Sequence, residues 1–415
     1  MEKPITTEAE VDAVLSRGVT EVIQYDELRE KLLTATEPLR IKLGIDPTSP
    51  NLHLGRSVPL LKLRDFMDLG HKAVLVIGDF TGTIGDTSDK DSERPMLEEN
   101  FVEENSLAYI QQLRTLLTEG GREDYFDDGR IEVRRNSEWL KKRSFGELVW
   151  YADMFSVADF IARDNIKRRL DAGKRVSLKE TLYPIMQGFD SVELRADVEL
   201  GGTDQRFNLL AGRTMQQKIH VVGQETKKIQ SIVMSPLING LDGRKMSSSW
   251  GNTINFTDEP LDMYGKVMSM SDDMLIDYFT YFTRVPMETI AGYKADLEAG
   301  QNPMEIKHEL ASEIVRMYHD ASAAAEARQN WVATFSGGGV PSDIQELSAG
   351  TYSTLSEILI AGDIVTSKTD FRRLLDAGAL RLYNDDDFTS LAEDILPDLP
   401  ATLKIGKKRF VRLIL

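Results

Sequence analysis

The sequence contains no cysteine, so disulfide bridges and thiolate metal sites are excluded. Long apolar runs are also missing: the longest, such as 73–77, are far shorter than a bilayer span, and the first residues lack the apolar core of a signal peptide. No membrane segment is therefore predicted, and a cytoplasmic location fits. Basic residues are outnumbered, 50 against 67 acidic ones, and the net charge of −17 argues against a general nucleic-acid coat.

The length of 415 residues is more than one ordinary hydrophobic core needs, so we predict several domains. Hydrophobic residues make up 41% and charged residues 28% of the chain, which is typical of a globular protein. The stretch Phe335-Ser-Gly-Gly-Gly-Val-Pro marks a flexible break. The domains predicted are an α/β domain over 1–238, a loop and helical domain over 239–334, a linker over 335–350 and a small domain over 351–415.

The first domain is predicted to contain a parallel sheet. Segment 40–46 alternates like a strand, the apolar spacing after Gly55 fits a helix that stops at Gly70, and 73–77 has the pattern of a buried strand. Such a βαβ unit has parallel strands. Residues 97–195 have amphipathic helical patterns and are predicted to interrupt the sheet. Three further strands are predicted after them, near 198–200, 219–222 and 232–237.

The segment His53-Leu-Gly-Arg56 lies at the turn from the first strand into the helix. Glycine lets a nucleotide approach the backbone, and the start of a helix directs free N–H groups and a positive dipole end at phosphate. A histidine there can donate to an oxygen that gains charge in a transition state. Alone, this short pattern is explained as well or better by an ordinary helix N-terminus.

The segment Gly243-Arg-Lys-Met-Ser-Ser-Ser249 is a second candidate, in a loop without apolar periodicity. A lysine followed by hydroxyl side chains on a mobile loop suits a lid that steadies a triphosphate. The alternative is a solvent-exposed loop without a function, and the segment alone does not decide between the two.

Together the two segments resemble the paired signatures of class I aminoacyl-tRNA synthetases, since they occur in this order about 190 residues apart with a βαβ unit between them. Further motifs resemble bacterial tyrosyl-tRNA synthetases: Leu43-Gly-Ile-Asp-Pro-Thr48, Gly82-Thr-Ile-Gly-Asp-Thr-Ser-Asp-Lys90, Tyr183-Pro-Ile-Met-Gln-Gly-Phe-Asp190 and Gly201-Gly-Thr-Asp-Gln-Arg-Phe-Asn208. The resemblance implies an α/β fold: a Rossmann-type parallel sheet with a helical insertion, a helical domain on the anticodon side, and an S-four-like α+β RNA-binding domain over the last 65 residues.

The resemblance also implies an activity, in which tyrosine is joined to ATP as an adenylate and passed to the 3′ end of its transfer RNA. Catalysis is expected of His53, Arg56 and Lys245. The expected ATP site comprises Gly44, Asp46, Thr48, His53, Gly202, Asp204, Lys245 and Ser247. The expected tyrosine site comprises Asp86, Tyr183, Gln187, Asp190 and Gln205. Pyrophosphate or the RNA end is expected to meet Lys90 and Arg94. The RNA-binding domain is expected to use Arg372, Arg373, Lys407, Lys408 and Arg409.

Asp190 is the expected reader of the tyrosine hydroxyl. Tyr183, Gln187 and Asp190 are spaced at i, i+4 and i+7, which puts them on one face of a helix. A buried acceptor that loses its partner costs free energy, so a phenylalanine substrate would be rejected. Tyrosyl-tRNA synthetases are themselves the standard example of discrimination by a site that hydrogen-bonds a substrate hydroxyl.

Three residues depart from the family's usual pattern. Arg56 stands where the first signature has a second histidine, and Ser248 stands where the second signature has a second lysine. Lys42 stands where many relatives have a tyrosine that touches the substrate phenol. Their roles are left open by the sequence.

The expected partners are ATP as a substrate, Mg²⁺ bound through its phosphates and water without a dedicated protein metal site, tyrosine, and tRNA(Tyr). A homodimer through the inserted helices is implied by the resemblance. A second basic cluster, comprising Arg163, Lys167, Arg168 and Arg169, is a further candidate for the acceptor stem. The alternatives are a tryptophan enzyme of the same class, a catalytically silent RNA-binding relative, and a small-molecule adenylate-forming ligase.

Overall fold

The computed structural model describes nine stretches of the chain, which form two compact units, Met1–Asp320 and Ala321–Leu415, each of which is treated by itself. The described residues are 6–86, 96–118, 123–219, 228–335, 344–350, 352–362, 364–384, 387–406 and 409–414. Among their helices, none combines the length and the apolar character that crossing a bilayer requires.

The first unit is built on a six-stranded sheet in the order β1-β6-β5-β2-β3-β4. The strands are β1 (Glu21–Ile23), β2 (Arg40–Ile45), β3 (Lys72–Ile77), β4 (Ile131–Arg135), β5 (Val198–Gly202) and β6 (Ser231–Ser235). All neighbours are parallel except β1, which runs antiparallel to β6. The α/β class with a parallel sheet is thereby confirmed.

Two edge strands were missed by the sequence analysis. β1 lies in the polar lead-in, and β4 lies inside the segment predicted as helical, so that prediction was wrong for Ile131–Arg135. Both strands are short and only partly buried, and edge strands of this kind carry a weak period-2 signal. The strand predicted near 219–222 was wrong at Ile219, which ends a helix, and the rest of it lies outside the described residues.

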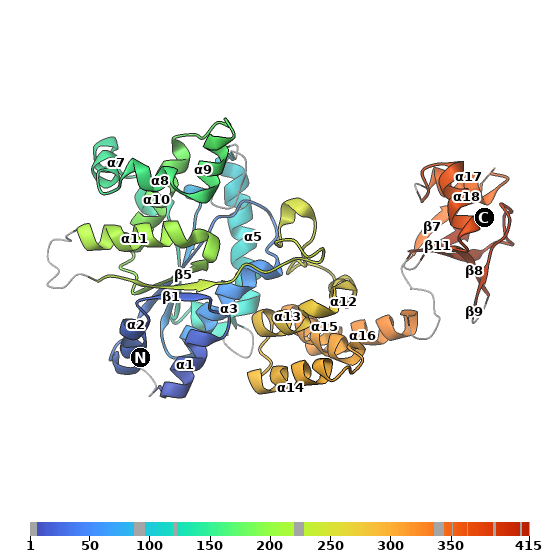
Figure 1. Ribbon diagram of the computed structural model, residues 1–415, viewed down its shortest axis with the longest axis horizontal. Helices are drawn as coiled ribbons and strands as arrows, with labels where there is room; N and C mark the ends of the chain where they lie inside the picture. The colour runs from blue at the N-terminus through green and yellow to red at the C-terminus, as the bar shows by residue number, and fades with distance from the viewer. Residues whose placement is uncertain are drawn as a thin grey trace. The chain divides into compact units, whose positions relative to one another are not determined.

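Helices cover both faces of this sheet, with α10 and α11 over one face and α1 to α3 over the other (Figure 1). The helix between the first two parallel strands, α3 (Leu54–Asp68), is buried around most of its circumference, as a central core helix should be. The other helices up to β6 are α1 (Glu8–Ser16), α2 (Tyr25–Thr34), α4 (Thr81–Ile84), α5 (Glu99–Thr118), α6 (Ser137–Leu140), α7 (Phe145–Ala152), α8 (Val157–Ile161), α9 (Asp164–Asp171), α10 (Lys179–Glu193) and α11 (Arg206–Lys218).

Helices α10 and α11 pack unusually closely because a glycine of each faces the other. A Cβ on Gly188 would lie 3.0 Å from the backbone nitrogen of Gly212 and 2.8 Å from the sulfur of Met215. Only a residue without a side chain allows this approach. The contact fixes the position of α10 against α11.

The first unit ends in a helical region, α12 (Pro260–Ser269), α13 (Leu275–Phe282), α14 (Met287–Glu298) and α15 (Met304–Tyr318). Arg17, after α1, joins this region to the N-terminal part of the chain. Its guanidinium donates to carbonyl oxygens at the end of α13, including those of Phe279, Thr280 and Thr283, over 2.7–3.1 Å. These carbonyls have no partner inside the helix, so the arginine caps it.

The second unit contains α16 (Ala321–Phe335) and a five-stranded sheet in the order β7-β11-β10-β8-β9. Its other elements are β7 (Gln345–Ser348), α17 (Leu355–Ala361), α18 (Lys368–Asp376), β8 (Leu380–Asn384), β9 (Asp387–Ser390), β10 (Ala401–Ile405) and β11 (Arg409–Ile414). The two short helices pack on the sheet through apolar residues such as Leu359 and Phe371. β7 pairs in parallel with β11 and lies inside the segment 335–350 that was predicted as a linker.

Candidate active site

The candidate site lies at the carboxyl ends of the parallel strands. β3 and β4 lie on one side of β2 whereas β5 and β6 lie on its other side, and such a reversal of strand order opens a crevice outside the strand ends. Asp46 follows β2, Gly78 follows β3, and Asp204 follows β5. Motifs that are far apart in the sequence therefore meet at one edge of the sheet.

The two signature segments lie against each other at this edge. At the start of α3, the backbone N–H of Leu54 donates to the Ile254 carbonyl oxygen at 2.9 Å, and that of Gly55 donates to the sulfur of Met246 at 3.1 Å. Beside Met246, the Nζ of Lys245 lies 3.1 Å from Oδ2 of Asp204. The loop is thereby fastened to the helix start and to the end of β5.

His53, which precedes α3, is partly buried and uncharged. Burial lowers its pKa to about 3, and the positive charges of Arg56 and Lys245 act in the same direction. Its Nδ1 is buried and has no hydrogen-bond partner among the described residues. A neutral imidazole still carries one N–H, so the ring can donate one hydrogen bond to an anionic oxygen at physiological pH.

Two glycines leave room for a ligand between these groups. Gly44 is the exposed position of the otherwise largely buried β2, and a Cβ there would meet no atom within 4 Å. A Cβ on Gly202 would lie 2.5 Å from Oδ1 of Asp204, so glycine is required to leave this carboxylate in place. Bare backbone between a carboxylate and an ammonium group suits a nucleotide.

Two hydroxyl residues expected at the nucleotide lie on the loops that frame this space. The backbone N–H of Thr48 bonds to the Asp46 carbonyl oxygen at 2.9 Å, which folds the loop after β2 into a tight turn. The backbone N–H of Ser247 donates to Oδ1 of Asn252 at 2.9 Å, so the signature loop is closed on itself.

The expected tyrosine residues form a second group of polar contacts. The Tyr183 hydroxyl donates to Oδ2 of Asp46 at 2.7 Å, and the amide of Gln205 donates to Oδ2 of Asp86 at 2.6 Å. Burial raises the pKa of Asp46 to about 6, although the hydrogen bond from Tyr183 opposes this. Asp46, assigned to ATP from the sequence, therefore joins the nucleotide side to the tyrosine side.

Asp190 lies at the base of this group and is only 4% exposed. Its two carboxylate oxygens accept hydrogen bonds from Nε1 of Trp139 at 2.8 Å and from Nδ2 of Asn136 at 3.3 Å. Burial raises its pKa to about 7, against the attraction of Lys42 and these two donors. A buried carboxylate with fixed geometry and remaining lone pairs can accept one more hydrogen bond.

Trp139 and Asn136 were missed by the sequence analysis because they lie just after β4, in the segment assigned to helices. Asn136 also donates to the hydroxyl of Thr81 at 2.9 Å and accepts from the backbone N–H of Phe80 at 3.0 Å. It therefore joins the loop after β3 to Asp190. A tryptophan in a polar stretch is the one signal that could have pointed here, because a buried indole N–H needs a partner.

The buried charge of Asp190 predicts a pH effect on stability. Its pKa is about 7 in the folded protein against an ordinary value of 3.8, so the folded state holds the proton more tightly. Stability therefore falls as the pH rises from about 4 to 7. At about 1.4 kcal/mol per unit of pKa, the loss approaches roughly 4 kcal/mol. In urea unfolding, the wild type should lose this much relative to the Asp190→Asn variant over that range. Parallel curves for the two proteins would contradict the buried charge.

Comparison with known proteins agrees with this geometry. Residues 34–336 match the model of the class I tRNA synthetases for tryptophan and tyrosine. The chain is 40% identical to a tyrosine–tRNA ligase of Symbiobacterium thermophilum and 39% identical to one of Carboxydothermus hydrogenoformans, over 97% of each chain. The chain belongs to the tyrosine–tRNA ligase family. The fold is similar to that of a C-terminally truncated mitochondrial tyrosyl-tRNA synthetase of Coccidioides posadasii, with a TM-score of 0.63, 24% identity, and coverage of 78% of this chain and 90% of that one.

In this member of the tyrosine–tRNA ligase family, the three unusual residues lie in different surroundings. Arg56 is exposed on the first turn of α3, and its charge adds to the effect of burial in lowering the pKa of His53 and opposes the effect of burial in raising the pKa of Asp46. Ser248 is exposed at the start of a short turn, Ser248–Trp250. Lys42 is almost fully buried and forms an ion pair with Glu199, with Nζ 2.8 Å from Oε1.

The residues expected to meet RNA are described only in part. Arg372 and Arg373 are exposed on α18, and Arg409 on β11 donates to the Ile364 carbonyl oxygen at 3.2 Å. Four other candidates lie outside the described residues: Lys90, Arg94, Lys407 and Lys408. The acceptor-stem prediction was wrong for Arg169, which is 2% exposed and paired with Glu180.

Among the described residues, no group of three or more His, Asp or Glu side chains could hold a metal ion. In this family ATP is a substrate, and its phosphates are themselves strong ligands for a hard cation.

Proposed function

We propose that this chain activates tyrosine with ATP and transfers it to tRNA(Tyr), and that the residues described above carry both steps. The observation that carries the proposal is the buried carboxylate of Asp190, which accepts hydrogen bonds from Trp139 and Asn136. An acceptor of this kind accepts a hydrogen bond from a phenol hydroxyl. Phenylalanine has no hydroxyl, so it would leave the buried carboxylate without this partner. The tryptophan alternative is disfavoured for the same reason, since an indole N–H is placed differently on its ring.

In the first step, an oxygen of the tyrosine carboxylate forms a bond to the α-phosphorus of ATP. The bond from that phosphorus to its bridging oxygen breaks, and pyrophosphate leaves with the electron pair. The proposed roles are positional: Asp86, Tyr183 and Gln187 hold the substrate ammonium group, and Gln205 lies near its carboxylate. Gly44, Thr48, Gly202 and Asp204 hold the nucleotide, with Asp204 on the ribose. Orientation of the two reactants supplies much of the acceleration.

Charge stabilisation is assigned to His53, Arg56 and Lys245. The pentacoordinate phosphorus and the leaving pyrophosphate gain negative charge, which the neutral His53 ring and the Lys245 ammonium stabilise by hydrogen bonding. Lys245 is paired with Asp204 without a ligand. When the ribose of ATP bonds to Asp204, it takes the place of Lys245, and the lysine side chain can then turn towards the phosphates. We assign Ser247 to the same phosphates. Pyrophosphate or the RNA end is assigned to Lys90 and Arg94.

Magnesium would accompany ATP through the phosphates and water. In the second step, the ribose hydroxyl at the 3′ end of the RNA attacks the carbonyl carbon of the adenylate, and AMP leaves. Because the product serves protein synthesis, we assign the enzyme to the cytoplasm.

The activation step is tested by amino-acid-dependent exchange of labelled pyrophosphate into ATP, run separately with each of the twenty amino acids. We expect exchange with tyrosine alone. Exchange driven by tryptophan instead would favour the other enzyme of the class, and a complete lack of exchange would favour a silent RNA-binding relative.

We assign the small domain predicted over 351–415, which lies within the second unit, to RNA binding. Replacement of Arg372 and Arg373 by alanine should weaken tRNA binding and make the logarithmic dependence of affinity on salt shallower by roughly two, because two phosphate contacts are lost. Pyrophosphate exchange should not change. Alanine at the exposed Lys294 on α14 serves as the control, and an unchanged salt dependence in the double variant would remove these two arginines from the RNA site.

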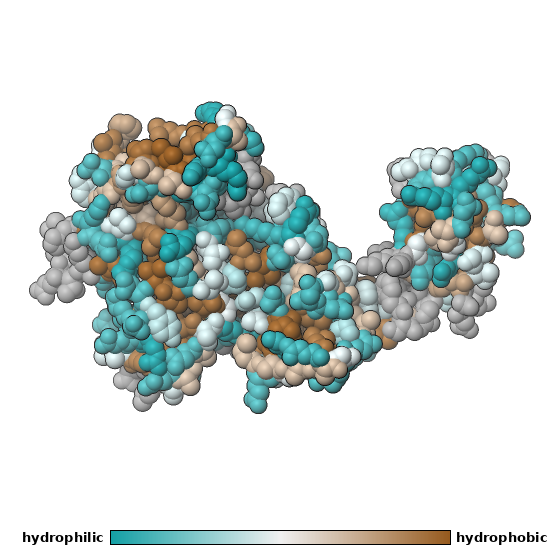
Figure 2. Space-filling model, viewed as in Figure 1, coloured by the Kyte–Doolittle hydropathy of each residue, from teal (hydrophilic) through white to brown (hydrophobic). Residues whose placement is uncertain are grey.

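We further propose that the chain forms a homodimer through the inserted helices. Large apolar side chains are exposed there, among them Phe145 at 81%, Val157 at 71% and Leu178 at 76%, and Figure 2 shows apolar surface gathered over this part of the first unit. Patches of this kind mark association surfaces.

A single substitution that introduces a charge tests the dimer. The wild type should sediment at twice the chain mass of 46.7 kDa. Replacing Phe145 by glutamate should give a species of single chain mass, since burying an unpaired carboxylate in an apolar contact is costly. Glutamate at Met287, an exposed apolar residue of α14, is the matched control. A monomeric wild type, or a dimeric Phe145 variant, would contradict this surface.

A further inference from the structure

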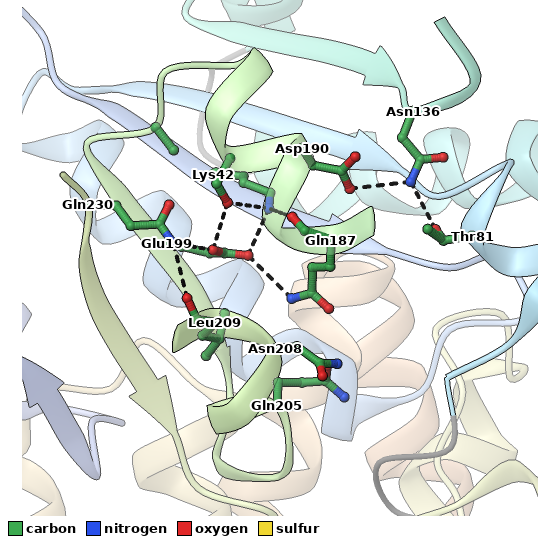
Figure 3. Close-up of polar contacts among 12 residues, drawn as sticks. Lys42, Thr81, Asn136, Gln187, Asp190, Glu199, Gln205, Asn208, Leu209 and Gln230 are labelled. Atoms are coloured by element: carbon green, nitrogen blue, oxygen red, sulfur yellow. Dashed lines mark hydrogen bonds and ion pairs between the residues drawn. The ribbon is translucent and has the colours of Figure 1, made fainter. Parts of the chain in front are cut away.

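A buried charged network lies beside Asp190 and is not explained by the reaction. Lys42 from β2 and Glu199 from β5 are each 1% exposed and form an ion pair of 2.8 Å. The carboxylate of Glu199 also accepts from the Ser191 hydroxyl at 2.9 Å, from the Gln187 amide at 3.3 Å, and from the Gln230 amide. Figure 3 shows the side chains of Lys42, Gln187 and Gln230 converging on Glu199.

The ammonium group of Lys42 has no hydrogen left for a substrate. Its three N–H bonds are directed to Oε1 of Glu199 at 2.8 Å, to the Ser191 hydroxyl at 2.8 Å and to the Gln187 carbonyl oxygen at 3.1 Å. An ammonium group has three donors, so all of them are in use. Lys42 therefore has no donor left for the contact with the substrate phenol that is expected of the tyrosine in many relatives.

The acceptors of Lys42 flank Asp190 on both sides in α10. Ser191 is the next residue, and Gln187 lies one turn earlier on the same helix. The lysine thus clamps the turn that carries Asp190 to the sheet, and its charge attracts the carboxylate. The other groups that face Asp190 are Trp139 and Asn136 as donors, Glu199, whose charge repels it, and Tyr183 on the same helix.

We propose that Lys42, paired with Glu199, is a specificity-determining positioning residue that sets how well Asp190 accepts the hydroxyl of tyrosine. This inference rests on the proposed function. A role in stability alone does not account for the pair, because buried ion pairs are often no more stabilising than apolar residues of similar size. A charge held beside Asp190 matters because an ionised acceptor makes a hydrogen bond about twice as strong as a neutral one.

The test uses the opposite signs of the two charges. In the full-length protein, Lys42→Met removes the attraction and Glu199→Gln removes the repulsion on Asp190. The pH dependence of kcat/KM for tyrosine is measured by pyrophosphate exchange. Because tyrosine use requires the ionised acceptor, its rise with pH should move to higher pH in the Lys42 variant and to lower pH in the Glu199 variant. Damage to the fold would move both in one direction.

The substrate dependence gives a second readout. Lys42→Met should raise KM for tyrosine by about tenfold, as expected when a charge-assisted hydrogen bond becomes an ordinary one, while KM for ATP and kcat stay within about twofold. The ratio of tyrosine to phenylalanine use should fall by a similar factor. A variant whose KM for both substrates rises together would point to general damage and overturn the proposal.

A double variant covers the case in which a single one fails to fold through an unpaired buried charge. Lys42→Met with Glu199→Gln leaves no charge and keeps the amide contacts, and since the attraction of Lys42 outweighs the repulsion of Glu199, KM for tyrosine should still rise. The matched control replaces the other buried pair that anchors α10, as Arg169→Met with Glu180→Gln. Equal effects of the two double variants, or a wild-type KM in the first, would refute the inference, whereas a wild type without tyrosine exchange would refute the proposed function itself.

Discussion

The Lys245→Ala variant should lose about 10²–10³-fold in kcat for adenylate formation, while its KM for tyrosine stays within about twofold. Lys245 is the cation of the signature loop, and its Nζ lies 3.1 Å from Asp204 at the nucleotide edge of the sheet. The polar contacts on the tyrosine side are made by other residues, since Tyr183 bonds to Asp46, Gln205 bonds to Asp86 and Trp139 bonds to Asp190, so tyrosine binding should be spared. An interaction that strengthens as charge develops on the phosphates lowers kcat when it is lost.

The neighbouring Arg244 provides a matched control for Lys245. Its guanidinium is paired with Asp242 and lies over the ring of Trp250, and it is well exposed. Alanine there removes a positive charge from the same loop without touching Asp204, so kcat should change by less than about threefold. Single-turnover measurement of adenylate formation separates chemistry from product release. Equal losses in the two variants would show that only the loop's overall charge matters.

The Asp190→Ala variant should lose about 100-fold or more in kcat/KM for tyrosine, with little change for phenylalanine. Tyrosine then loses a hydrogen bond to a charged acceptor, and the indole N–H of Trp139 and the amide of Asn136 are left without their partner, at about 1–3 kcal/mol for each unsatisfied group. Phenylalanine loses nothing, because it never bonded to the carboxylate. Preference for tyrosine should therefore collapse before activity disappears.

Two measurements keep this result interpretable. Thermal unfolding of the Asp190 variant should show a folded protein, since removing the buried charge offsets part of the lost hydrogen bonding. Alanine at Glu193, an exposed residue of the same turn of α10, tests whether any change in this turn has the same effect. Specificity for tyrosine that survives in a folded Asp190→Ala protein would mean that another group reads the hydroxyl.

The domain boundaries predicted from the sequence remain a prediction. What the structure adds is a second unit that begins with α16 and includes β7 as an edge strand. The short β7 follows a glycine-rich break and is mostly exposed, so neither periodicity nor apolar content distinguishes it from a linker. Its identity as a strand depends on β11, more than 60 residues later.

Local sequence patterns were enough to predict the parts of the site that depend on residues close together in the chain. The first signature lies at the strand-to-helix turn that the alternation of 40–46 and the apolar spacing after Gly55 predicted, and the spacing of Tyr183, Gln187 and Asp190 put three polar groups on one helix face. Such inferences succeed because they depend on the periods of strands and helices.

The partners of these groups were decided only by the tertiary structure. Tyr183 bonds to Asp46, Asp190 is held by Trp139 and Asn136, and Lys42 is paired with Glu199, across 51 to 157 positions of sequence. β4 was missed for the same reason: its alternation is weak, and it forms a strand by pairing with β3. The sequence by itself determined which chemistry is available at the edge of the sheet. The folded chain decided which charges are buried together, because pairing and burial depend on segments brought together from distant parts of the chain.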